Sequence, residues 1–100
     1  MPPNDRDEPP RGSLRQGRDA VSNRLGEGGV LVNLRTNRIF ELNATGMRAW
    51  ELIGEGHTQG EIERTLEQEF EVERARVRTE LATLIGDLAR EGLVDADPDA

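Results

Sequence analysis

The chain has 100 residues, a formal net charge of −7 and no cysteine. Its length allows one small domain with a modest core, and the lack of cysteine excludes disulfides, thiolate chemistry and cysteine-based metal sites. All 13 basic residues are arginines, so long-range attraction to nucleic acid is missing although local arginine contacts remain open. No apolar run approaches the roughly 18 residues of a membrane span, and the N-terminus lacks the apolar core of a signal peptide. We therefore expect a cytoplasmic protein.

The first 17 residues contain four of the five prolines together with many charged residues, and they show no apolar periodicity. Such a composition predicts a disordered arm, which is either a solvated tail or a tether for a larger partner. The folded domain is expected over residues 18–95, and an acidic tail over residues 96–100.

Three strands are expected in the first half of this domain. The runs at residues 18–25, 29–35 and 38–43 contain the aliphatic and β-branched residues typical of strands. Thr36 and Asn37 form a polar break short enough for a tight hairpin, and the glycines between residues 26 and 29 mark an earlier turn. Because the spacing Gly26-x-x-Gly29 lacks the lysine and the following helix of a phosphate-binding loop, it indicates only a turn.

The second half of the domain predicts three helices. They are expected at about residues 44–53, 58–70 and 74–91. Asn43 is a suitable N-cap for the first helix, Thr58 and Glu61 have capping-box spacing for the second, and Gly92 ends the third. In each segment the apolar residues recur every three or four positions, which indicates one buried face. The fold class is therefore α+β, with a three-stranded antiparallel sheet followed by three helices.

The third helix has two distinct sides. Its apolar arc, which includes Leu81 and Ile85, is expected in the core. One flank carries Ala75, Ala82 and Ala89 at intervals of seven residues. These small side chains favour either a shallow groove or close packing of a neighbouring element.

No residue pattern indicates catalysis, a cofactor or a metal ion. His57 stands alone in a glycine-rich loop and fits a solvated histidine better than a ligand or a base. The many glutamates between Glu61 and Glu73 fall mostly on outward helix faces and indicate a solvated acidic surface. We expect a protein that is not an enzyme and that needs no cofactor.

A three-stranded sheet that cannot close into a barrel leaves a strand with unpaired backbone groups. An extended peptide can add to such an edge, with main-chain hydrogen bonds for affinity and side-chain pockets for specificity. If the third helix lies along that edge, Leu81, Ala82 and Ile85 supply the pockets. Arg74 and Arg78 are four residues apart and suit an acidic guest, although salt bridges to the chain's own glutamates explain them equally well.

Residues 31–53 carry a resemblance to a known family. A strand that ends in Glu41-Leu42-Asn43 is followed by small residues and a helix with Trp50, and the chain later reads Leu84-x-x-x-Leu88-x-x-x-Gly92-Leu93-Val94. This combination resembles the PqqD-like family of small peptide-binding domains, also called RiPP recognition elements. The resemblance covers about residues 20–95.

The resemblance implies a winged helix-turn-helix-like fold that captures the leader of a ribosomally made precursor peptide. In that family the leader adds as a strand beside the third strand and rests against the third helix, which correspond here to residues 38–42 and 74–85. The implied peptide-binding residues are Arg38, Ile39, Phe40, Glu41, Leu42, Arg74, Arg78, Leu81, Ala82 and Ile85.

A free-standing chain of this size further resembles the leader-binding proteins of lasso-peptide pathways. The implied partners are a precursor peptide and a leader peptidase or other maturation enzyme, with no nucleic acid and no membrane. Two alternatives stay open. One is a nucleic-acid-binding winged helix that uses Arg74, Arg76 and Arg78, and the other is an adaptor for a radical enzyme, as in pyrroloquinoline quinone biosynthesis.

Overall fold

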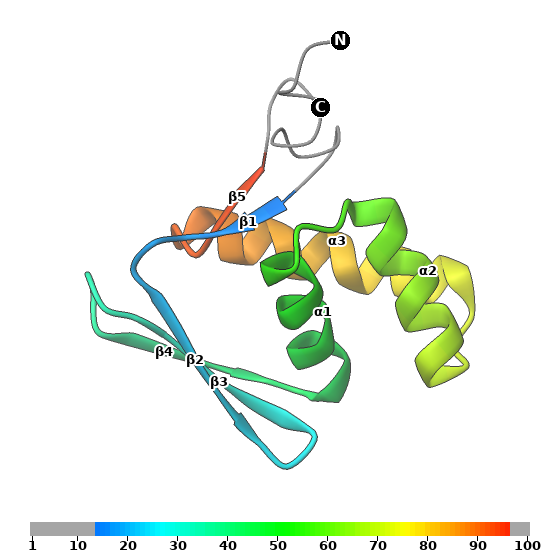
Figure 1. Ribbon diagram of the computed structural model, residues 1–100, viewed down its shortest axis with the longest axis horizontal. Coiled ribbons are helices and arrows are strands. Elements are labelled where there is room, and N and C mark those ends of the chain that lie inside the picture. Colours follow the sequence, from blue (N-terminus) through cyan, green and yellow to red (C-terminus); the bar gives the residue numbers. More distant parts are fainter. Residues whose placement is uncertain (1–13, 97–100) are drawn as a thin grey trace, which may run out of the picture.

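The computed structural model describes residues 14–96 (Figure 1). In chain order the elements are β1 (Leu14–Gln16), β2 (Ala20–Leu25), β3 (Gly28–Asn33), β4 (Arg38–Leu42), α1 (Ala44–Gly54), α2 (Gln59–Phe70), α3 (Arg74–Arg90) and β5 (Val94–Ala96). The predicted class is confirmed, because an antiparallel sheet of order β2-β3-β4 precedes three helices. In Figure 1 this sheet lies on one side of α1, and α2 lies on the other.

The two hairpins of the sheet close through residues in the left-handed region. Gly26 takes φ 63° in the turn between β2 and β3, where glycine has no steric cost. Asn37 takes φ 63° at the end of the loop between β3 and β4, and its N–H donates to the Asn33 carbonyl at 2.7 Å. Both strands of this predicted hairpin are thus confirmed, but the two-residue break at Thr36 and Asn37 is wrong, because β3 ends at Asn33 rather than Arg35 and the loop takes the four residues 34–37.

A second, two-stranded sheet corrects the predicted limits of the domain. The sequence predicts an arm over residues 1–17 and a tail from residue 96, but β1 pairs antiparallel with β5, with Leu14 opposite Ala96. Leu14 is buried at 3% exposure, and a single apolar residue among polar neighbours gives no periodic signal. Gly17, the residue after β1, also contacts the C-terminal end of the domain, because its N–H donates to the Leu93 carbonyl at 2.7 Å. The rest of the predicted arm and tail, residues 1–13 and 97–100, lies outside the described residues.

The helices begin as the capping residues predict, with one exception. Asn43 accepts from the Gly46 N–H at 2.8 Å, and Thr58 and Glu61 form a complete capping box at the start of α2. Glu73 precedes α3 without any side-chain cap. Glu71 ends α2 with φ 51°, so the chain reverses between α2 and α3 through a left-handed residue.

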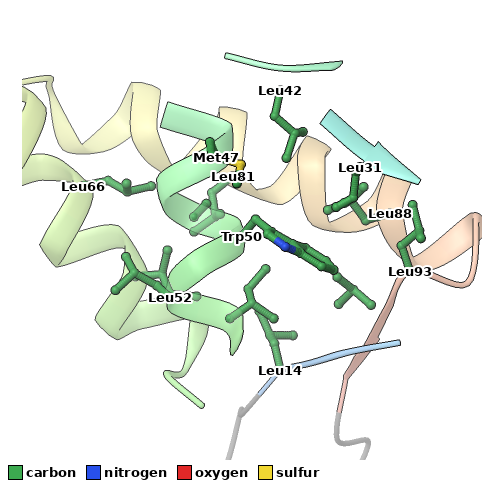
Figure 2. Packing of buried hydrophobic residues seen from close by; sticks show 14 of the residues in the cluster. Leu14, Leu31, Leu42, Met47, Trp50, Leu52, Leu66, Leu81, Leu88 and Leu93 are labelled. Carbon is green, nitrogen blue, oxygen red and sulfur yellow. The ribbon is translucent and has the colours of Figure 1, made fainter. Parts of the chain in front are cut away.

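The core is centred on Trp50, which is 1% exposed. Figure 2 shows its indole among Leu31 of β3, Leu88 of α3 and Leu93 in the turn after α3, with Leu14 of β1 on the other side. Because α1 contributes Trp50, it is the element against which both sheets and both other helices are organised. No helix within residues 14–96 is both long and apolar enough to cross a membrane.

Candidate functional site

The outer edge of β4 has unpaired backbone groups. β4 pairs only with β3 in the sheet order β2-β3-β4, and Phe40 lies opposite Leu31. The Leu34 N–H donates to the Asp19 carbonyl at 2.9 Å, which sets the alternation of the ladder: β3 residues of one parity bond β2, and those of the other parity bond β4. The N–H and C=O groups of Ile39 and Glu41 therefore point away from the sheet.

Neither terminal strand covers this edge in the described part of the chain. β1 and β5 pair with each other in a separate sheet, and Figure 1 places them at the other end of α1 from the point where β4 ends. The edge that the sequence predicts for peptide binding is therefore open among residues 14–96.

A groove of about 360 Å³ lies between the end of β4, the first turns of α1 and the length of α3. Its apolar lining is Leu42, Ala49, Leu66, Val77, Leu81 and Leu84. Its polar lining is Glu41, Asn43, Thr45, Thr79, Glu80, Thr83 and Asp87. Leu42, Leu66 and Leu81 surround the N-terminal half of α1 in Figure 2. The groove thus has an apolar floor directly beside the unpaired backbone of Glu41.

The structure divides the ten predicted site residues into two groups. The first group consists of the five residues of β4, which are at the open edge, together with Leu81 of α3. Three of these six, Glu41, Leu42 and Leu81, line the groove. Arg38 does not reach into it, because its guanidinium pairs with Glu91 at 3.1 Å and lies 5.4 Å from the Phe40 ring centre.

The second group lies on the opposite flank of α3 and does not line the groove. It consists of Arg74, Arg78, Ala82 and Ile85. Arg74 pairs with Glu67 at 3.1 Å, and Arg78 pairs with Glu63 at 3.5 Å, both on α2. Of the two explanations for these arginines, salt bridges to the chain's own glutamates match the observed contacts. Ile85 packs partly against the core.

The alanine flank is likewise not the wall of the groove. Ala75, Ala82 and Ala89 are exposed, and no described element packs closely over them. Instead the flank that faces β4 carries Glu80, Leu84 and Asp87 at helical spacing. A helical wheel defines both flanks of α3, but it does not tell which one meets the sheet. Of the groove residues that were not predicted, Glu80, Leu84 and Asp87 share the spacing i, i+4, i+7, which is a signal that the sequence contains.

The charges at the groove are acidic. Glu41, Glu80 and Asp87 line it, and no basic residue does. Glu80 accepts from Arg76 at 2.7 Å, and this hydrogen bond raises the pKa of Arg76. Asp87 accepts from Arg90. Within residues 14–96 no three His, Asp or Glu side chains gather as a metal site, so the arrangement offers backbone hydrogen bonds, apolar contacts and negative charge.

The fold and the groove define a class: a small winged helix-turn-helix-like domain with an open strand edge facing its last helix. The chain belongs to the PqqD family, since the model described as "Coenzyme PQQ synthesis protein D (PqqD)" matches residues 28–94. That match extends from the first residue of β3 to the first residue of β5. It includes every residue that lines the groove.

Two solved structures share the fold. The chain is 30% identical to TbiB1, solved in complex with the TbiA(beta) leader peptide, with a TM-score of 0.76 over 85% of this chain and 99% of that one. A lasso peptide synthetase B1, complexed with the leader peptide, is 24% identical with a TM-score of 0.73 over 83% of this chain and 98% of that one. The search of curated proteins found no match.

Proposed function

We propose that this protein binds the leader segment of a ribosomally made precursor peptide, without catalysing a reaction, and delivers it to a separate maturation enzyme of lasso-peptide biosynthesis. The observation that carries the proposal is the position of the groove beside an open strand edge. The likeness to TbiB1, whose structure holds a leader peptide, supports the same function.

In this proposal the leader forms a fourth strand beside β4. The N–H and C=O groups of Ile39 and Glu41 pair with its backbone, and alternate leader side chains enter the groove over Leu42, Leu81 and Leu84. A disordered leader loses conformational entropy when it binds, so main-chain pairing and apolar burial must together exceed that cost. The proposal thus keeps the β4 residues of the predicted site and replaces the arginine and alanine flank with the groove flank of α3.

Delivery requires no active site on this chain. A leader held on β4 keeps the attached precursor at a high effective concentration near any enzyme that binds the same complex. A leader peptidase or another modifying enzyme is the proposed recipient.

Nucleic-acid binding has less support. The net charge is −7, and two of the arginines at the start of α3 pair with glutamates of α2, while Arg76 pairs with Glu80 within its own helix. Phosphate binding would have to displace these carboxylates, so a winged-helix regulator is not favoured by the observed contacts.

The test uses the precursors encoded next to this protein. The N-terminal half of each short neighbouring reading frame is synthesised with a fluorescent label and titrated with the full chain in a fluorescence anisotropy assay. We expect one peptide to bind saturably, and a scrambled version of it to bind at least about ten-fold more weakly. If no peptide binds better than its scrambled version, the proposal fails.

Hydrogen exchange then locates the bound strand. Backbone amides that gain hydrogen bonds exchange more slowly, so the amides of Ile39 and Glu41 should gain protection in the complex while those of Phe40, already bonded to β3, change less. Protection confined to β2, the other edge of the sheet, would contradict the proposed site.

A further inference from the structure

The structure also points to the charge of the bound peptide, and this inference rests on the proposed function. We propose that the leader carries a lysine or arginine directly opposite Glu41, on the outer face of the strand that runs beside the groove. The open edge and the groove define the site itself, and the carboxylates determine only which peptide it selects. The charge is the reverse of the acidic guest that Arg78 suggests from the sequence.

The register of the sheet places the Glu41 side chain next to the guest. Glu41 lies opposite Val30 of β3, and opposing residues of a ladder point to the same face. Any strand that adds to β4, parallel or antiparallel, therefore places one side chain beside Glu41 on the outer face of the sheet. The Cβ atoms of such neighbours are about 5 Å apart, which is within reach of a lysine or arginine.

The Glu41 carboxylate has no counter-charge on that face within residues 14–96. It is exposed and takes part in none of the salt bridges of the described chain. Its cross-strand neighbours are Val30 and, beyond it on β2, Asn23, and Ile39 is the next side chain along the same face of β4. The residue that a guest places opposite Glu41 is therefore the first available partner for its charge.

The α3 side of the groove adds negative charge of the same sign. Glu80 and Asp87 pair only with arginines of their own helix, Arg76 and Arg90, whose side chains are each 73% exposed. Exposed pairs of this kind are weak, and both arginines lie outside the groove lining. An acidic side chain would therefore meet like charge at either face of the guest strand, from Glu41 on the outer face and from Glu80 and Asp87 on the groove face.

The alternation of a strand completes the recognition pattern. Side chains next to the basic residue point to the other face, toward Leu42 and the apolar floor of the groove. The selected sequence is therefore an extended segment in which a lysine or arginine is flanked on each side by apolar residues.

The first test is a selection that does not depend on the identity of the natural leader. A displayed library of random extended peptides is enriched for binding to the full chain, and competition among the binders identifies those that share one site. We expect lysine and arginine to be enriched next to apolar positions, and aspartate and glutamate to be depleted. Site-sharing binders without this bias would overturn the inference and leave the proposed function standing, whereas a library without site-sharing binders would count against both.

The second test uses charge reversal. For one selected peptide, replacing the basic residue with glutamate should weaken binding by about five-fold or more at low salt, and the difference should shrink as salt rises. Glu41→Lys should reverse the preference between the two peptides. Glu71→Gln is the control, because it removes an exposed carboxylate in the turn between α2 and α3, away from the groove. Equal affinity of the two peptides for the unmodified chain would refute the inference.

Discussion

The side-chain amide of Asn33 donates a 2.8 Å hydrogen bond to the backbone carbonyl of Glu91, which ties the loop end of β3 to the end of α3. The Oδ1 atom of Asn33 accepts from the Arg35 N–H at 2.9 Å, so both ends of the amide are used. Arg38, opposite Asn33 on β4, pairs with the Glu91 carboxylate at 3.1 Å. These contacts join the start of β4 and the loop end of β3 to the residue that ends α3.

Replacing Asn33 should therefore lower stability. Asn33 is 2% exposed, so Asn33→Ala leaves the Glu91 carbonyl and the Arg35 N–H without their partner, at a cost of about 1–3 kcal/mol. Urea unfolding followed by the fluorescence of Trp50, the only tryptophan, measures the change. Arg38→Ala, which removes an exposed contact to the same residue, should cost much less; equal losses would show that the buried amide is not the stronger link.

The order of elements was predictable because each one carries a local signal. Alternation and turn residues gave β2, β3 and β4, and the caps Asn43 and Thr58 marked the starts of two helices. The β1–β5 pair was not predictable as a sheet, since strands of three residues have too few positions to show a period. Their pairing depends on contacts between the two ends of the domain, which local sequence does not contain.

The candidate site was predictable in part for a similar reason. Strand order and family resemblance pointed to the edge of β4, and Leu81 belongs to the groove as expected. The choice between the two flanks of α3 depends on the angle at which the helix crosses the sheet. This angle is set by core packing around Val77, Leu81 and Leu88, which local sequence does not contain. The prediction therefore used the alanine flank and did not include Thr83 and Leu84.

Leu14 should contribute to stability although it lies in the predicted arm. Its side chain is 3% exposed and belongs to the core cluster, so Leu14→Ala should cost about 2–4 kcal/mol through lost burial and a residual cavity. Arg15→Ala, at the exposed neighbouring position, should change stability by less than about 0.5 kcal/mol. Urea unfolding compares the two, and an unchanged midpoint for Leu14→Ala would mean that β1 is not a stable part of the domain.

Adjacent residues of α3 offer a test of which flank binds the peptide. Thr83 lines the groove and Ala82 does not, and both are exposed. Thr83→Arg should fill the groove and weaken leader binding by about ten-fold or more, as expected where a bulky group displaces buried anchors. Ala82→Arg adds the same bulk and charge on the other flank and should bind nearly as well as the unmodified chain. The opposite ranking in anisotropy titrations would return the site to the alanine flank.

The ion pair between Arg24 and Glu51 predicts how stability depends on pH. The hydrogen bonds from Arg24, at 2.9 and 2.8 Å, lower the pKa of Glu51, with Arg48 adding to the effect. Because the pKa is lower in the folded chain, the pair stabilises the fold above the unfolded value of about 4.3 and loses this contribution as the pH falls through the folded pKa. Thermal midpoints should therefore drop below about pH 4.3, and Glu51→Gln should be a few degrees less stable at pH 7 with a flatter acid limb. If the thermal midpoint of Glu51→Gln falls with pH as steeply as that of the unmodified chain, the Arg24–Glu51 pair is not a cause of the loss of stability in acid.

The backbone of Glu41 gives the sharpest test of strand addition. Its N–H points away from β3, so proline at this position removes a hydrogen bond only to the guest, and a solvent-facing edge tolerates proline. Glu41→Pro should therefore keep the fold, seen as an unchanged circular dichroism spectrum, but weaken leader binding by about ten-fold or more. Glu41→Gln isolates the charge, so the backbone effect is the affinity ratio between the proline and glutamine variants. At position 40 the N–H belongs to the β3 ladder, and Phe40→Pro should instead lower stability. If Glu41→Pro binds the leader as tightly as Glu41→Gln, then the peptide does not pair with the edge of β4.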